Sequence, residues 1–242
     1  MEPPKLPIVV YSLIGFAALA TVISLIGPNV DLALAGLGFD PVARRFHGHN
    51  PYFNMLRDHG VVAVVTCGIC VALAFTKYLP WRILPSLRAR TATFLTLSLL
   101  LGPGLLVNGI LKQHWGRPRP FTVTEFGGPL NFVNWWNPGG ACQQNCSFVS
   151  GEAATAAWMF GPAMLVPPPW RGVAIAAAAL FTATMSGLRM AVGAHFFTDA
   201  VFGALSTVLI LLAMRALIDP LPGHVPGGAR MGVENSHPRP TA

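Results

Sequence analysis

Six stretches of mostly apolar residues recur along the chain, and they restrict its fold more than any other feature. They are residues 7–27, 61–76, 93–111, 153–166, 172–188 and 196–218. A helix needs about 20 mostly apolar residues to cross the hydrocarbon core of a bilayer. The stretches therefore predict an all-α, polytopic membrane protein with six transmembrane helices in a bundle. The second and fourth are short, and each needs flanking residues or a thinned bilayer.

The composition agrees with this prediction. Of the 242 residues, 53% are hydrophobic and only 10% are charged, whereas soluble domains carry about 25% charged residues. The net charge of +7 does not indicate nucleic acid, because the basic residues are scattered between apolar stretches and form no stripe. We expect one membrane domain over residues 1–218 and a disordered, polar, Pro/Gly-rich tail over residues 219–242.

Lys and Arg are slightly more numerous on the side shared with the N-terminus, which places that side in the cytoplasm. Two long loops, residues 28–60 and 113–150, then lie outside. Residues 40–46 fit either a short amphipathic helix on the membrane surface or a solvated loop. The tryptophans at 115, 135 and 136 are expected to anchor the second loop at the interface.

The four cysteines form two groups. Cys67 and Cys70 fall in an apolar stretch and are expected to be packing residues. Cys142 and Cys146 fall in the second outer loop, where an oxidising compartment favours a disulfide. Zinc binding is less favoured, because two thiolates alone leave the ion short of ligands.

Three segments place ionisable residues where an apolar stretch meets the outer side. They are residues 112–120, 146–152 and 189–199. Charged groups are costly next to lipid, so such residues are candidates for function. If the topology is right, all three segments lie on the same face of the membrane.

The third segment combines His195 with Asp199, four residues later. This spacing places both on one helix face. The carboxylate is expected to accept the proton of one ring nitrogen, which leaves the other nitrogen as a nucleophile. Arg189 offers a planar set of donors suited to phosphate. Taken alone, the pair is equally well explained as a structural hydrogen bond at a helix end.

The other two segments also suit an anion. Lys112 and Arg119, with Arg117 between them, bring cations together, although basic residues beside a span also bind lipid headgroups. Ser150 and Gly151 precede a helix, where backbone N–H groups bind anions. The alternative is an ordinary N-cap with an acidic residue in the first turn. Three such segments on one face favour a phosphate site.

Together the segments resemble the signature of the type 2 phosphatidic acid phosphatase family. That signature is Lys, six residues, Arg-Pro; then Ser-Gly-His; then Arg, five residues, His, three residues, Asp. The first motif is complete in Lys112 and Arg119-Pro120, and the third is complete in Arg189, His195 and Asp199, although Leu188 replaces the usual Ser before it. In the second motif Glu152 stands in place of His.

The resemblance implies a mechanism without a metal or any other cofactor. The phosphate would be bound by one set of residues, namely Lys112, Arg119, Ser150, Gly151 and Arg189. His195 would form a phosphohistidine and Asp199 would orient it. The His that Glu152 replaces protonates the leaving oxygen in the family. Glu152 is thus expected to act as the acid; His114 is an alternative, and a leaving group that needs little protonation is another.

The resemblance also suggests substrates. Bacterial members that this chain resembles act on lipid A, undecaprenyl diphosphate, phosphatidylglycerol phosphate or phosphatidate. The Ser-Gly-Glu motif and the long first outer loop favour lipid A. The expected place is a bacterial inner membrane with the site facing the periplasm, and the expected partners are the lipid substrate and the bilayer. The alternatives are non-catalytic lipid-phosphate binding or transport, and lipid phosphotransfer. Soluble vanadium haloperoxidases share the anion pocket, but six apolar stretches argue against that activity.

Overall fold

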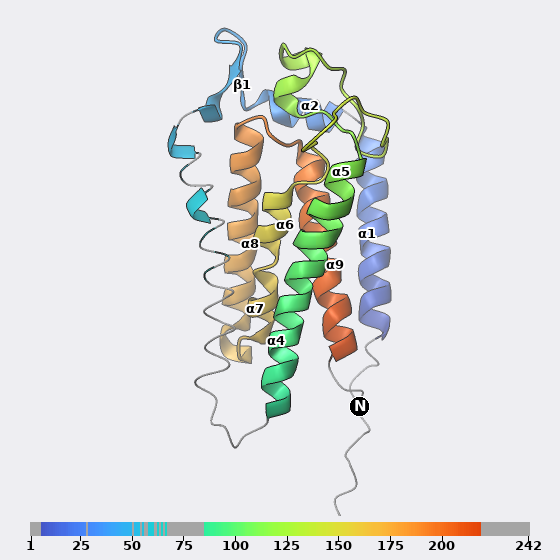
Figure 1. The fold of residues 1–242 in the computed structure, drawn as a ribbon, viewed down its shortest axis with the longest axis vertical. Coiled ribbons are helices and arrows are strands. Elements are labelled where there is room, and N and C mark those ends of the chain that lie inside the picture. The colour runs from blue at the N-terminus through green and yellow to red at the C-terminus, as the bar shows by residue number, and fades with distance from the viewer. Residues whose placement is uncertain are drawn as a thin grey trace, which may run out of the picture.

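The chain folds into a bundle of helices that run along one long axis, as the computed structural model shows (Figure 1). The structure describes residues 6–27, 29–49 and 85–218, and between the last two ranges residues 51–53, 55, 58–60, 62, 64 and 66. The long elements are α1 (Leu6–Ile26), α4 (Pro85–Leu99), η2 (Leu100–Leu111), α8 (Pro168–Ala191) and α9 (Phe197–Ile218). The short helices between them are α5 (Lys112–His114), α6 (Gly151–Ala157) and α7 (Phe160–Leu165). The mainly helical fold is therefore as predicted.

Three helices within the described residues are long and apolar enough to cross a membrane. They are Thr91–His114, Pro168–Ala191 and Phe197–Ile218. Large apolar side chains such as Leu13, Leu100 and Leu180 are exposed on the outside of the bundle. Apolar surface this extensive suits lipid better than water. The predicted second span lies largely outside the described residues, as do the tail and Cys67 and Cys70.

The fourth predicted span is not one continuous helix, which corrects the expectation for residues 153–166. α6 and α7 are separated at Trp158 and Met159. Pro162 has no N–H to continue the helical hydrogen bonds, and the Trp158 carbonyl accepts from the Gly161 N–H instead, at 2.8 Å. The buried Trp158 indole donates to the Leu95 carbonyl at 3.2 Å, which fixes the break against α4.

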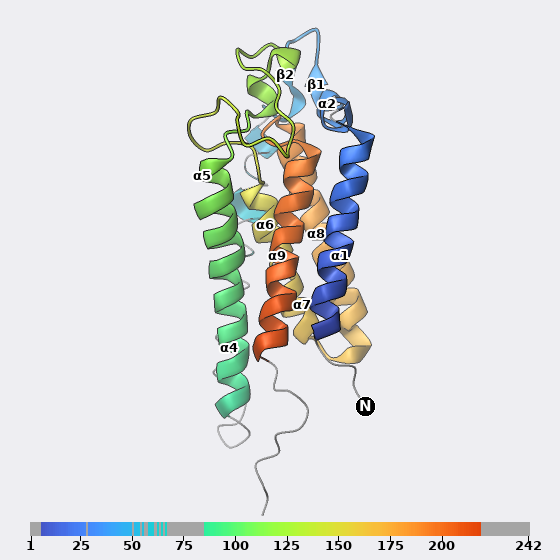
Figure 2. The ribbon, with the colours of Figure 1, turned by 90° about the vertical axis from the view of Figure 1, so that its right-hand side faces the viewer.

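α9 lies at the centre of the described bundle. It contacts α1, α4, η2 and α6, and Figure 2 shows it between α4 and α1. Near its start a Cβ on Gly203 would lie 2.5 Å from the Ser150 carbonyl oxygen, so glycine allows the closest approach to α6. The segment before α6 and the start of α9 are thereby held together.

One end of the bundle is covered by short elements, and we call it the capped end (Figure 1). They are α2 (Asn29–Gly36), β1 (Phe39–Asp40), β2 (Arg45–Phe46), η1 (His47–His49), η3 (Pro120–Thr122) and η4 (Thr124–Phe126). Residues 41–44 form the exposed turn of an antiparallel hairpin, so the amphipathic helix was wrong and the solvated loop was right for these four residues. Asp40 Oδ1 accepts from the Val42 and Ala43 N–H groups at 2.9 and 3.0 Å, which stabilises the turn.

Aromatic residues pack the inside of the capped end. Trp115 lies against Phe148 with ring centroids 4.6 Å apart, and Trp135 lies against Phe202 at 4.3 Å. Only Trp136 of the three predicted interface tryptophans is largely exposed. Trp115 and Trp135 therefore form core, because the loop folds back over the helix ends instead of lying flat.

Candidate active site

A cavity of about 580 Å³ opens at the capped end. It is lined by Asp58, Val62, Lys112, Arg119, Asn145, Glu152 and Arg189. Its volume falls within the roughly 300–1,000 Å³ of small-ligand pockets. The structure thus brings residues of all three predicted segments to one cavity.

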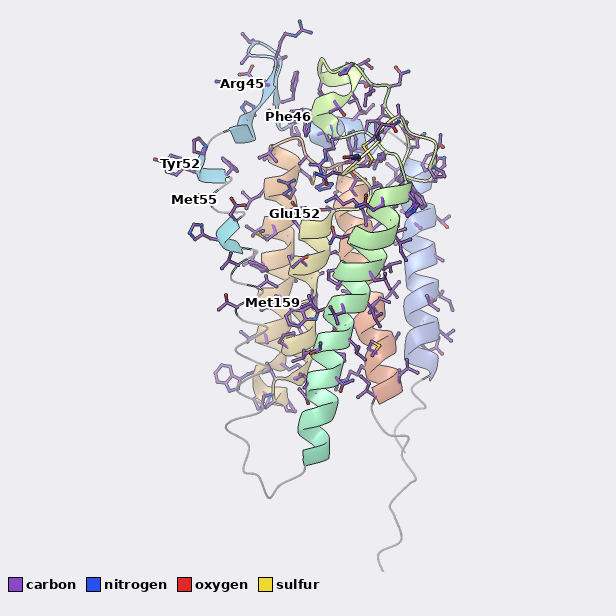
Figure 3. All side chains as sticks on the ribbon, in the orientation of Figure 1. Arg45, Phe46, Tyr52, Met55, Glu152 and Met159 are labelled. Carbon is purple, nitrogen blue, oxygen red and sulfur yellow. A yellow bond between two sulfur atoms is a disulfide. The ribbon has the colours of Figure 1, made fainter. Side chains whose placement is uncertain are left out.

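The three cations and Glu152 reach the cavity from a helix end or from the loop next to one. Lys112 ends the long helix Thr91–His114, Glu152 is in the first turn of α6, and Arg189 is in the last turn of α8. Arg119 lies in the following loop, where its Nε donates to the Asn145 carbonyl at 3.0 Å. Figure 3 shows Glu152 nearer than Met159 to the hairpin of Arg45 and Phe46. The cavity therefore places three cations around Glu152, and Asp58 is a second carboxylate in its lining.

His195 is fully buried between α8 and α9, directly behind Glu152. Its Nε2 lies 3.4 Å from Glu152 Oε2, and its Nδ1 lies 2.8 Å from the Ser147 carbonyl oxygen. A carbonyl only accepts hydrogen bonds, so Nδ1 carries a proton. Nε2 is then the nitrogen that faces Glu152, and Glu152 lies between His195, which does not itself line the cavity, and the cavity.

Asp199 does not bond to His195 directly, which corrects the expected His–Asp pair. Its nearest carboxylate oxygen lies 3.9 Å from Nδ1, beyond hydrogen-bond distance. Instead it accepts from the Ser147 hydroxyl at 2.5 Å and from the Phe196 N–H at 2.8 Å. Ser147 was missed from the sequence, because it precedes His195 by 48 residues and acts partly through its backbone.

Arg117 lies beneath the cavity and not in it. It is fully buried, and its Nη1 donates to Asp199 at 2.5 Å while its Nη2 donates to Asp31 at 2.7 Å. Its guanidinium also lies over the Phe196 ring, 4.5 Å from the centroid. Asp31 was missed as well. Its position as the one charged residue of α2, among apolar neighbours, was the available signal.

Ser150 and Gly151 form an ordinary N-cap at the start of α6, which was the alternative to an anion site. The Ser150 hydroxyl accepts from the Ala153 N–H at 3.2 Å as an N-cap, and the Ser150 N–H donates to the Asp199 carbonyl at 2.9 Å. A Cβ on Gly151 would lie 2.5 Å from Asn108 Oδ1, so this glycine permits helix packing. Neither is among the described residues that line the cavity.

Burial and charge set the protonation of the two facing groups. Burial lowers the pKa of His195, although the hydrogen bond and charge of Glu152 oppose the shift. Glu152 lies 3.2 Å from Arg189 Nε and lines the cavity together with Lys112 and Arg119, and these cations favour its charged form. Glu152 is therefore an anion at neutral pH.

A disulfide joins Cys142 and Cys146, as the spacing predicts. It closes the turn that contains Asn145, whose carbonyl accepts from Arg119. His114, the alternative acid, is exposed, and its Nδ1 lies 2.8 Å from the Ile110 carbonyl. Within the described residues, no group of three or more His, Cys, Asp or Glu side chains is arranged to hold a metal ion.

Comparison with known proteins identifies the family. Residues 91–220 match the PAP2 superfamily. The chain belongs to this superfamily. The match contains Lys112, Arg119, Glu152, Arg189 and His195, whereas Asp31 and Asp58 precede it. The predicted membership of the type 2 phosphatidic acid phosphatase family is confirmed.

Similar curated proteins share one name. The lipid A 4'-phosphatase of Francisella tularensis subsp. novicida is 31% identical over 201 residues, which cover 82% of this PAP2 protein and 90% of the relative. The lipid A 4'-phosphatases of Rhizobium leguminosarum and Rhizobium etli are each 44% identical over 122 residues. These matches cover 50% of this chain and 52% and 48% of the relatives, so the chain spans about half the length of the Rhizobium proteins. No solved structure matches the chain.

Proposed function

We propose that this PAP2 protein is a membrane phosphatase that removes phosphate from a lipid through a phosphohistidine on His195. One observation carries the proposal: Nε2 of His195 lies 3.4 Å from Glu152, which lines a cavity together with three cations. A phosphate group needs this combination of positive charge and a nucleophile at one place. Family membership and the names of the relatives support the same activity.

In the proposed reaction Lys112, Arg119 and Arg189 bind the phosphoryl oxygens. The Nε2 lone pair attacks phosphorus, and the bond to the lipid oxygen breaks with its electrons leaving on that oxygen, which then takes up a proton. Water next attacks phosphorus, the P–N bond breaks, and inorganic phosphate leaves. Asp199 stabilises the positive imidazole ring from nearby, while the Ser147 carbonyl keeps the proton on Nδ1.

Glu152 is proposed to move the protons of both steps. Before substrate binds, its oxygens lie 3.2 Å from Arg189 Nε and 3.4 Å from His195 Nε2. A bound phosphate takes over these cations and adds negative charge nearby, and both effects raise the pKa of a carboxyl group. Glu152 then protonates the leaving oxygen and later accepts a proton from the attacking water.

The proposed substrate is lipid A, on which the names of all three relatives agree. The cavity lining adds support, since Asp58 and Asn145 are suited to sugar hydroxyl groups and lie beside the cations. Undecaprenyl diphosphate, phosphatidylglycerol phosphate and phosphatidate are the lipids to compare.

We further propose six spans in a bacterial inner membrane, with the capped end in the periplasm. α6 and α7 together form the fourth span, and residues 61–76 supply the second from their apolar sequence. The Cys142–Cys146 disulfide at the capped end supports this orientation, because disulfides persist in the oxidising periplasm and not in the cytoplasm.

The test measures phosphate release from lipid A and the other three lipids by purified protein in detergent. His195→Ala is expected to abolish release, and a base-stable, acid-labile phosphoprotein should form with the wild type only. His114→Ala, which alters an exposed histidine outside the cavity lining, is the matched control and should remain active. Binding without release would indicate a lipid-phosphate binding protein, and transfer to a second lipid would indicate a phosphotransferase.

A further inference from the structure

A buried carboxylate outside the matched family region is connected to His195 through Arg117 and Asp199. Asp31 on α2 is 2% exposed, and each of its carboxylate oxygens accepts hydrogen bonds. Oδ1 accepts from the Thr198 N–H at 2.9 Å. Oδ2 accepts from the Thr198 hydroxyl at 2.6 Å and from Arg117 Nη2 at 2.7 Å.

Arg117 therefore lies between two carboxylates, those of Asp31 and Asp199. All three side chains are 3% exposed or less. Charges buried this deeply are screened weakly, so they act on neighbours over several ångströms. One cation between two anions leaves a net negative charge, and Arg117 does not cancel the field of Asp199 at His195.

Resting on the phosphatase proposed above, we infer that Asp31 is a positioning residue, which acts through Arg117 to preserve the negative charge of Asp199 beside the imidazolium formed when His195 bonds to phosphorus. Without the Asp31 charge, Arg117 and Asp199 form a neutral pair. The positive ring then loses stabilisation, although the cations that bind phosphate are unchanged.

The other charges that face His195 come from every neighbouring element. Glu152 faces it from α6, Arg119 from the loop after α5, and Asp199 from the start of α9. Arg189, at the end of α8, pairs with Glu152. An Asp31 variant alters none of these side chains, so its effect on the ring is separable from theirs.

The experiment compares Asp31→Asn with the wild type by steady-state kinetics and pH profile on lipid A. We expect kcat to fall roughly 10- to 100-fold, as for loss of one electrostatic contact in a transition state, with KM changed less than about threefold. The acidic limb of kcat/KM should move to lower pH, because a ring with less negative charge nearby protonates at lower pH. Asp40→Asn is the control, because it removes a carboxylate of the same capped end that accepts hydrogen bonds from the Val42 and Ala43 N–H groups of its own turn.

A double variant, Asp31→Asn with Arg117→Gln, separates charge from simple packing. Removing both charges leaves the single negative charge of Asp199, the same net charge as in the wild type. The acidic limb of kcat/KM is therefore expected at or above the wild-type pH, even if less protein folds. An acidic limb that stays at the wild-type pH in Asp31→Asn, or one that falls further in the double variant, overturns the inference. A wild type that releases no phosphate from any lipid overturns the proposed function as well.

Discussion

The Nδ1 nitrogen of His195 hydrogen-bonds to the backbone carbonyl of Ser147, 2.8 Å away. A backbone carbonyl keeps its position whatever side chain the residue carries. The tautomer that leaves Nε2 free is thus set by the main chain, and Asp199 acts one step away, through the Ser147 hydroxyl and the Phe196 N–H.

Ser147→Ala is accordingly expected to be mild. It removes one hydrogen bond to the charged Asp199 but keeps the carbonyl, so kcat/KM should fall about 10-fold, the lower end for a hydrogen bond to a charged group. Asp199→Asn removes the charge near the ring and a partner of buried Arg117, and should cost at least about 100-fold. Kinetics of the two purified variants test the ranking. Equal losses in both would mean that Asp199 needs the Ser147 hydroxyl to act at all.

If Glu152 is the acid, as proposed, the effect of replacing it depends on the leaving group. Glu152→Gln should lower kcat on lipid A about 100-fold or more, because a sugar oxygen needs a proton to leave. With p-nitrophenyl phosphate, whose leaving group needs none, the loss should be much smaller. Glu152→His restores the usual family residue and should recover activity on lipid A. Equal losses with both substrates would exclude Glu152 as the acid.

The contact between His195 and Glu152 also predicts how activity depends on pH. Burial lowers the pKa of His195 below its usual 6.5, so the ring is neutral at pH 7, and kcat/KM should decline only as the pH drops through the lowered value. The charge of Glu152 raises the pKa of His195. Glu152→Gln should therefore move the acidic limb to lower pH. A limb that moves upward would show that the two groups do not interact in this way.

Two arginines on one helix offer a matched comparison. Arg189 lines the cavity at the end of α8, whereas Arg171, near its start, donates to the Val166 carbonyl at 3.0 Å. Arg189→Gln should cost about 100-fold or more in kcat/KM, as expected for a cation on a transferring phosphoryl group. Arg171→Gln should stay within about threefold of wild type, since it leaves the site intact. Similar losses in both variants would indicate a general effect on α8.

The disulfide predicts redox-sensitive substrate binding. Cys142 and Cys146 close the turn whose Asn145 carbonyl accepts from Arg119. Breaking it with Cys142→Ala and Cys146→Ala together should loosen Arg119 and raise KM by about 3- to 10-fold, the worth of roughly one hydrogen bond. Dithiothreitol should do the same to the wild type and nothing further to the variant. Unchanged KM in the reduced wild type would show that the turn holds without its crosslink.

Sequence reasoning identified the three cations and Glu152 in the cavity because their chemistry is local, but it missed Asp58, Val62 and Asn145 of the same lining. Apolar length predicted the helices, and the motif spacing placed Lys112, Arg119 and Arg189 at helix ends that meet. Sequence reasoning failed where a residue's partner is distant in the sequence or is a backbone group. Nothing local links Asp31 to Arg117 or assigns His195 to the Ser147 carbonyl, since both contacts depend on how the capped end folds over the bundle.

Replacing Gly193 tests whether the β1–β2 hairpin holds the turn that carries His195. Its φ is +67°, and a Cβ there would lie 2.5 Å from the Phe46 ring. Gly193→Ala should lower stability by at least about 1 kcal/mol, from backbone strain alone, and should reduce kcat because the turn must move. Gly187→Ala lies in α8, which ends just before Gly193, and no described atom lies within 4 Å of its added Cβ, so it should be neutral or stabilise by up to about 1 kcal/mol.

Thermal unfolding in detergent and kcat on lipid A measure both glycine variants. Adding Phe46→Leu to Gly193→Ala should recover part of the lost activity, because the smaller side chain relieves the contact but not the positive φ. If Gly193→Ala matched Gly187→Ala in stability and kcat, the hairpin would have no part in placing His195. The α8–α9 turn would then be held by other contacts, such as the hydrogen bond from the Phe121 N–H of η3 to the Gly193 carbonyl at 3.1 Å.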